Sequence, residues 1–125
     1  MPRPRAAVDF EPQRALAALL PAATEDIKWG ADLVFSVGAK MFCVFLLREG
    51  RAAICSFKVD DERFLELTSV PGVVPAPYLA RAKWVQVQTG HGLTADDLDA
   101  LIKRSHALVA GKLTKRLQHE LGLLP

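Results

Sequence analysis

The chain has 125 residues, of which 50% are hydrophobic and 24% are charged, so it can fold around a core and is not a disordered tail. Its 16 Lys and Arg against 14 Asp and Glu give a net charge of +2, which by itself indicates no particular partner. Two cysteines exclude a disulfide-stapled scaffold, and no apolar run is long enough to cross a membrane. We expect one cytoplasmic α+β domain over residues 1–125, with residues 1–8 loose, no secretory signal and no membrane partner.

A helix followed by a series of strands is predicted for the first half of the chain. Asp9 can accept hydrogen bonds from first-turn amides, so the helix should start there and continue to Leu20, before Pro21 stops it. The residues expected on its buried side are Phe10, Leu16, Leu19 and Leu20. Apolar alternation and Gly-containing turns then predict strands at 26–29, 33–37, 40–47 and 51–59.

The third of these strands is apolar on both sides, which is typical of a central strand. It contains Cys43, and the next strand contains Cys55. A two-residue loop at Glu49-Gly50 would set Cys43 opposite Ser56 and turn the two thiols to opposite faces of the sheet. A loop one residue longer would let them meet. In either case we expect buried, unreactive thiols.

Helices dominate the predicted second half. We expect a helix at 60–69, extended proline-containing backbone at 71–77 and a strand at 84–88. A long helix should then continue to Gly111, which bends or breaks it, and a second helical piece should follow at 112–121. Thr94 and Asp97 have the spacing of a capping box, with Asp in place of the usual Glu. The helix that follows this pair is the clearest one in the chain.

The sequence has no motif for catalysis, metal binding or nucleotide binding. His91, His106 and His119 lack the spacing of metal ligands, and we expect His106 on the polar side of the long helix. The carboxylates at 60–62 and 96–99 stand at predicted helix N-termini, where they compensate the helix dipole. We therefore predict no metal, no cofactor and a non-enzymatic role. An enzyme using one of these scattered groups is the less favoured alternative.

The basic residues are informative through their arrangement. No acid occurs between 67 and 95, where Arg81 and Lys83 precede a tryptophan, nor between 100 and 119. On a helix, one face would hold Lys112, Lys115, Arg116 and His119. These cations can form a phosphate-contacting patch; the alternative is an ordinary solvated surface.

Five segments resemble the MmcQ/YjbR family in their order and spacing. They are residues 38–42, 56–62, 71–78, 82–85 and 98–113. The resemblance extends from about residue 20 to residue 117, and it lies in the combination of segments and not in any single motif.

The resemblance implies a CyaY-like α+β domain, with an antiparallel sheet of about five strands covered by N- and C-terminal helices. It also implies a "double wing" DNA-binding protein that contacts phosphates. The basic positions that match the family are Lys40, Lys58, Lys83 and Lys112, and the charge layout adds Arg81, Lys115 and Arg116. Frataxin shares this fold, but the first predicted helix has only Asp9 and Glu11 as acids, so we do not transfer iron binding.

A second hypothesis is an adaptor domain that binds a protein or a small ligand without nucleic acid. It would use the proline segment around Tyr78 and the exposed side of the sheet. Tyr78 and Trp84 could stack on bases or cover the core, and for Trp84 we favour the core.

Overall fold

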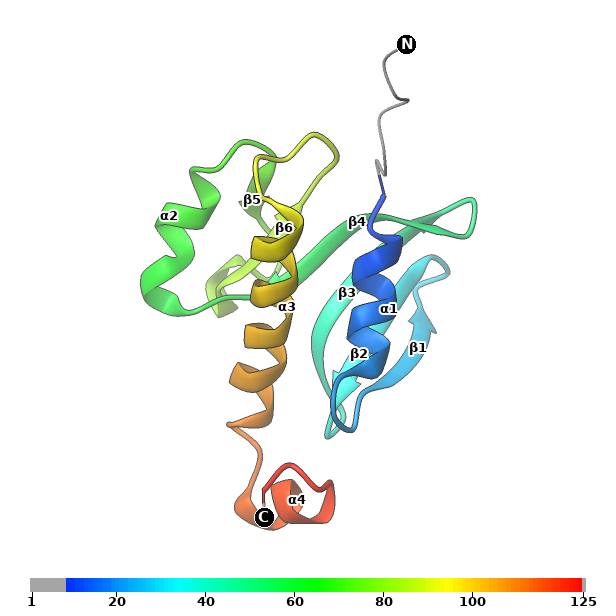
Figure 1. Ribbon diagram of the computed structural model, residues 1–125, viewed down its shortest axis with the longest axis vertical. Coiled ribbons are helices and arrows are strands. Elements are labelled where there is room, and N and C mark those ends of the chain that lie inside the picture. The colour runs from blue at the N-terminus through cyan, green and yellow to red at the C-terminus, as the bar shows by residue number, and fades with distance from the viewer. Residues whose placement is uncertain (1–8, 125) are drawn as a thin grey trace.

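The computed structural model describes residues 9–124, so the expectation that residues 1–8 are loose lies outside the described residues. The strands are β1 (Thr24–Lys28), β2 (Asp32–Val37), β3 (Lys40–Arg48), β4 (Arg51–Lys58), β5 (Val73–Pro75) and β6 (Trp84–Val87). The helices are α1 (Glu11–Leu19), α2 (Phe64–Thr68), α3 (Ala95–Ala110) and α4 (Lys115–Glu120), with 3-10 turns at Asp61–Arg63 and Ala80–Ala82. Figure 1 shows their arrangement.

The six strands form one antiparallel sheet in the order β1-β2-β3-β4-β6-β5. This confirms the predicted α+β class. Strand β5 was not predicted, because three residues ending in a proline resemble turning backbone. The strand is possible because it lies at the sheet edge, where Pro75 needs no ladder donor.

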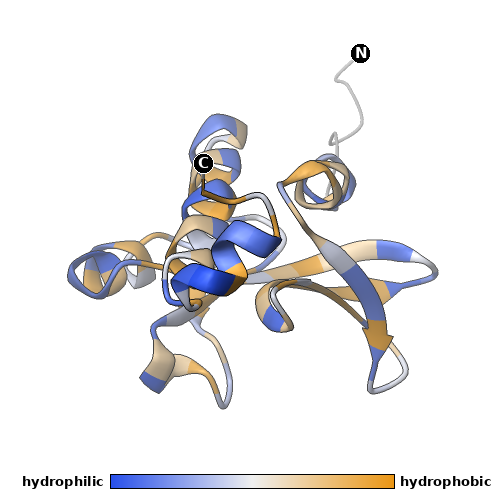
Figure 2. Ribbon diagram, turned by 90° about the horizontal axis from the view of Figure 1, so that it is seen from below, coloured by the Kyte–Doolittle hydropathy of each residue, from blue (hydrophilic) through white to orange (hydrophobic). Residues whose placement is uncertain are grey.

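One face of the sheet carries the core. Helices α1 and α3 pack against each other and against the sheet on that face, and Figure 2 shows both on the same side. As predicted, β3 lies centrally, between β2 and β4. Its Cys43 and Phe45 are fully buried, whereas Val44 and Leu46 on the other face are only partly covered.

The predicted orientation of the cysteines is wrong. The hairpin turn has the expected two residues, since Arg48 pairs with Arg51, but a β-bulge at Ala53 shifts the register by one. Cys43 therefore lies opposite Phe57, and the two thiols share the buried face with their sulfurs 3.9 Å apart. Both cysteines are buried, as expected, and burial raises the pKa of the Cys55 thiol.

Helix α1 confirms the predicted helix, and Phe10 and Leu20 contact the core as expected, but Leu19 does not. Gln13 and Ala17 are buried and Leu19 is 82% exposed. Leu19 is two residues beyond Ala17, about 200° around the helix, so it faces solvent when Ala17 faces the core. The N-cap residue is Phe10 and not Asp9. The Asp9 carboxylate accepts a hydrogen bond from the Glu11 amide and forms an ion pair with Arg51.

Helix α3 begins with the predicted capping box between Thr94 and Asp97. The expectation that His106 lies on its polar side is wrong. His106 is buried, its Nε2 lies 2.8 Å from the Pro21 carbonyl oxygen, and its ring packs edge-on against Phe42. The chain after α1 thus supplies the polar partner that makes burial of an imidazole acceptable.

Ser105, also on α3, ties two strands to the helix. Its hydroxyl donates to the Phe42 carbonyl oxygen at 2.6 Å and accepts from the Lys58 amide at 3.0 Å. Phe42 is the extra residue where the β2–β3 register shifts, so its backbone lacks a regular ladder partner. Within residues 9–124, no helix combines the length and apolar character that a membrane span needs.

Candidate functional site

Three lysines from distant parts of the sequence line one hollow of about 430 Å³. We call it the lysine hollow; it is lined by Lys40, Lys58 and Lys112, together with Ala39, Met41, Val109 and Leu113. Lys40 is the first residue of β3, Lys58 is the last of β4, and Lys112 follows the end of α3. Sheet and helix termini therefore meet here.

Close packing of the C-terminal segment on a turn brings Lys112 to this place. Gly38 has a left-handed φ of +57°, and a Cβ placed on it would lie 2.6 Å from Leu113 Cδ1 and 3.3 Å from Leu117 Cδ2. Only a glycine leaves room for the two leucines at this distance. The same turn leads directly into Lys40, so the packing fixes both lysines relative to each other.

Burial and two neighbouring lysine charges act on the Lys58 ammonium. Partial burial lowers its pKa most, the positive charge of Lys112 lowers it further, and Lys83 contributes in the same direction. The carboxylate of Asp61 acts in the opposite direction. The Lys58 ammonium also donates to the Ala82 carbonyl oxygen at 2.5 Å.

Lys83 precedes Trp84, the strand partner of Lys58, and does not itself line the lysine hollow. It has a left-handed φ of +63°, and its ammonium lies 5.2 Å from the centre of the Phe64 ring. Arg81 is two residues earlier, on the exposed 3-10 turn. Three of the seven predicted phosphate-contacting residues, Lys40, Lys58 and Lys112, thus line one hollow, and the charge of Lys83 acts on Lys58.

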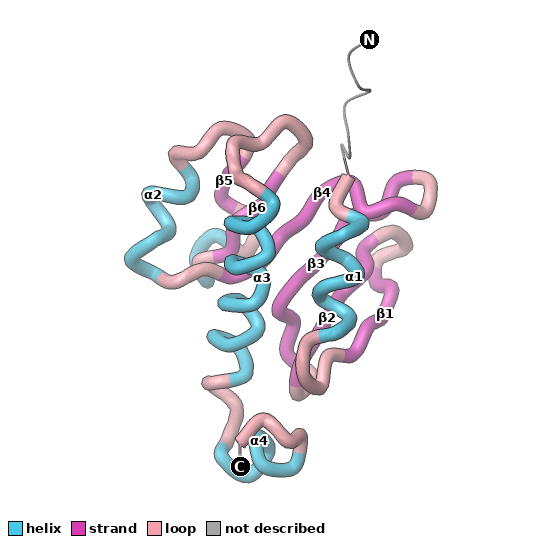
Figure 3. Tube along the Cα trace, viewed as in Figure 1, coloured by secondary structure: helices cyan, strands magenta, loops and turns pink. Residues whose placement is uncertain are grey.

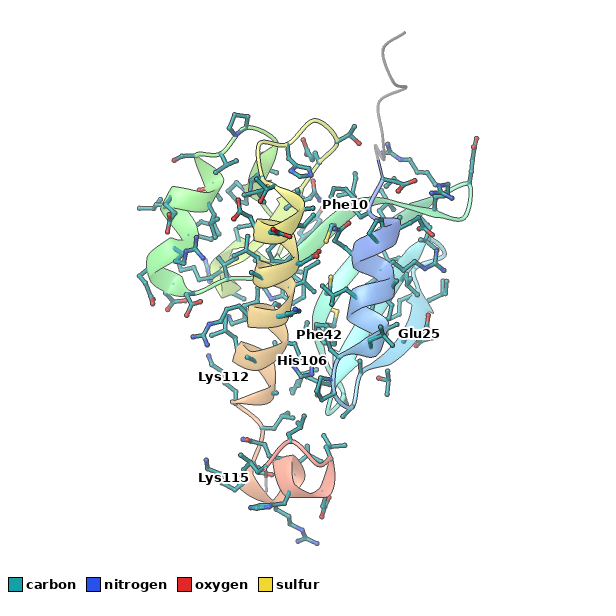
Figure 4. All side chains as sticks on the ribbon, in the orientation of Figure 1. Phe10, Glu25, Phe42, His106, Lys112 and Lys115 are labelled. Carbon is teal, nitrogen blue, oxygen red and sulfur yellow. The ribbon has the colours of Figure 1, made fainter. Side chains whose placement is uncertain are left out.

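The predicted single face of Lys112, Lys115, Arg116 and His119 is wrong, because Lys112 is not on the same helix as the other three. A loop separates α3 from α4, which begins at Lys115 behind the N-cap Thr114 (Figure 3). Figure 4 shows Lys112 just after the end of α3 and Lys115 on α4. Arg116 forms an ion pair with Glu120, with Nε 3.0 Å from Oε1.

The scattered groups considered for catalysis have structural partners. The Asp60 carboxylate accepts hydrogen bonds from Arg104 Nε at 2.9 Å and from Arg104 Nη2 at 2.8 Å. These hydrogen bonds lower the pKa of Asp60. His91 stacks on Phe10 and accepts from the Leu93 amide, while burial lowers its pKa. Over residues 9–124, no three His, Cys, Asp or Glu side chains gather as a metal site.

A second hollow lies on the sheet face that α1 and α3 leave uncovered. This sheet groove has a volume of about 640 Å³, and its lining residues are Trp29, Asp32, Met41, Val44, Leu46, Ile54, Ser56, Gln86 and the segment 76–79. Trp84 is buried, as favoured from the sequence, and Tyr78 is fully exposed. The sequence analysis missed Trp29, because a single tryptophan before a glycine turn carries no periodic signal.

The described residues thus define an α+β domain with an open six-stranded antiparallel sheet and a lysine-lined hollow at one end. The YjbR family model matches residues 18–108, more than half of the chain, and the chain belongs to this family. This confirms the resemblance on which the sequence analysis relied.

The solved structures similar to the chain include the following two. A Deinococcus radiodurans protein with a DUF419 domain is 31% identical, with a TM-score of 0.77 over 90% of this chain and 86% of that chain. A Pseudomonas syringae protein is 20% identical, with a TM-score of 0.62 over 78% of this chain and 97% of that chain, a likeness of fold alone. No curated protein sequence matches the chain significantly.

Proposed function

We propose that this protein binds DNA by holding backbone phosphates at the lysine hollow, without catalysis. The observation that carries the proposal is the placing of Lys40, Lys58 and Lys112 around one hollow. Gathering like charges is unfavourable in the free protein; partial burial is the main cause of the lowered pKa of Lys58, and the charge of Lys112 lowers it further. A bound phosphate would reverse the sign of the interaction and release counterions from the DNA.

The remaining basic residues have supporting roles in this proposal. Lys83 acts on Lys58 through its charge, while Arg81 and Lys115 are exposed cations that do not line the lysine hollow. Arg116 contributes less, because Glu120 neutralises part of its charge. Contacts of this kind give affinity that depends on salt and carries little base preference. Such a role agrees with the cytoplasmic location expected from the sequence.

The test compares two double variants that remove the same charge. Lys40→Ala with Lys112→Ala empties the lysine hollow of two cations, whereas Arg48→Ala with Lys103→Ala removes two exposed cations that do not line it. Arg48 ends the strand that Lys40 begins, so it lies at the opposite end of β3. We expect the first pair to weaken binding of a labelled oligonucleotide at low salt by about tenfold or more, and the second to leave it within about twofold.

The measurement is fluorescence anisotropy, with circular dichroism to check that each variant is folded. Absence of binding by the wild-type protein at low salt contradicts the proposed function. Equal loss of affinity in both double variants also contradicts it, because the effect would then follow net charge and not the lysine hollow.

A further inference from the structure

The sheet groove opens onto solvent on the face opposite the core helices. Its floor consists of partly covered apolar side chains, Met41, Val44 and Ile54 among them, with Ser56 and Gln86 as polar groups. The pairing of Val44 with Ser56 and of Ser56 with Gln86 places these three side by side across β3, β4 and β6. The floor therefore spans neighbouring strands and is apolar with two hydrogen-bonding groups.

Two aromatic residues that line this groove have highly exposed side chains and a left-handed backbone. Trp29 is 72% exposed and Tyr78 is 104% exposed, although both line the groove. Both also have a left-handed backbone, with φ of +51° and +66°, a conformation that bulky residues rarely adopt. Backbone strain of this kind is concentrated at functional sites. The Lys28 ammonium lies 6.0 Å from the Trp29 ring centre and adds a cation at this rim.

The sheet groove and the lysine hollow are neighbours, because Met41 lines both. A ligand lying across Met41 would meet apolar surface on one side and lysines on the other. Asp32 is an acidic residue of the groove lining, so the groove itself does not favour anions. The arrangement of charges therefore favours a ligand in which planar, mostly uncharged groups are joined to phosphates.

We propose that the nucleic acid bound here is single-stranded, with its bases in the sheet groove against Trp29 and Tyr78 and its phosphates in the lysine hollow. This inference rests on the proposed function and specifies the form of nucleic acid that the site takes. Base faces are open to aromatic side chains only in an unpaired strand, and stacking of this kind tolerates any sequence. A duplex would offer its phosphates to the lysines but no base faces to the groove.

The test measures binding of a thymidine oligonucleotide, of a duplex of mixed sequence and of inorganic polyphosphate, which has charges without bases. The variants are Trp29→Ala and Tyr78→Ala, with Leu65→Ala as the control. Leu65 is 79% exposed and lines neither hollow. We expect each aromatic variant to weaken binding of the single strand about tenfold, with duplex and polyphosphate binding unchanged. Trp29 fluorescence should also change when the single strand binds.

The outcomes separate this inference from the proposed function. The inference is overturned if the aromatic variants bind the single strand as tightly as wild type while loss of Lys40 and Lys112 still weakens all three ligands. In that case the lysine hollow remains a phosphate site. Absence of binding to both DNA forms at low salt overturns the proposed function as well.

Discussion

Lys58 is the residue at which the electrostatics of the lysine hollow can be measured. Its pKa is lowered by burial, then by the charge of Lys112. Lys112→Ala should therefore raise the pKa of Lys58 toward its ordinary value, because one repelling charge is gone. A titration followed by nitrogen-15 NMR at Lys58 Nζ measures this directly. Arg48→Ala, at the far end of β3, should leave the pKa unchanged; an equal rise there would mean that the effect is not local.

His91 gives the protein a predicted pH dependence of stability. Burial lowers its pKa below the ordinary value of 6.5, so the unfolded chain binds the proton at a higher pH than the folded one. The free energy of unfolding is thus highest above about 6.5 and decreases as the pH falls from there to the folded-state pKa. Protonation also removes the acceptor that the Leu93 amide uses.

The variant His91→Asn tests this pH dependence, because a side-chain carbonyl can replace the acceptor without titrating. Urea unfolding at a series of pH values should show a flatter profile for His91→Asn than for wild type. His119→Asn, at an exposed position of α4, serves as the control and should keep the wild-type profile. An unchanged profile in His91→Asn would assign the pH dependence to other groups.

At the scale of the elements, Ser105 determines how α3 meets the sheet. Ser105→Ala leaves the Phe42 carbonyl and the Lys58 amide without their partner in a buried place. We expect a loss of about 2 kcal/mol in the free energy of unfolding, measured with urea. Ser69→Ala removes an exposed hydroxyl that donates to Leu65, and it should cost much less. Similar losses in both variants would contradict the role given to Ser105.

The turn before β3 offers a matched pair of glycines. Gly38→Ala adds a Cβ into Leu113 and Leu117 as well as straining a left-handed backbone, whereas Gly50→Ala adds the same kind of strain with nothing within 4 Å. Gly50→Ala should cost about 1 kcal/mol and Gly38→Ala about 1–3 kcal/mol more. Thermal unfolding of the two variants measures the difference. Equal costs would mean that the C-terminal segment does not pack on the turn as described.

For the whole molecule, the sequence predicted most elements and their class because their signals are local. The alternation in β3, the capping box at Thr94 and the proline after α1 each depend on a few neighbouring residues. The errors came from long-range effects. The bulge at Ala53 reversed the expected orientation of the cysteines, and the Pro21 carbonyl allowed His106 to be buried.

The candidate site shows the same division. Lys40 and Lys58 were identified only through family resemblance, and the fold brings them to one hollow with Lys112, which the charge layout had also indicated. Helical spacing alone grouped Lys112 with Lys115 and Arg116, because it could not detect the loop between α3 and α4. The contribution of Trp29 to the sheet groove depends on how the β1–β2 turn lies against distant residues, which periodicity does not report.

The most direct test of the account is the salt dependence of oligonucleotide binding. Each phosphate contact to a single strand contributes about 0.7 to the slope of log K against log salt concentration. Loss of both Lys40 and Lys112 should therefore make the wild-type slope less steep by about 1.4, while loss of Arg48 and Lys103 should leave it unchanged. The same slope in wild type and in the Lys40 and Lys112 double variant would contradict the claim that the lysine hollow holds phosphates.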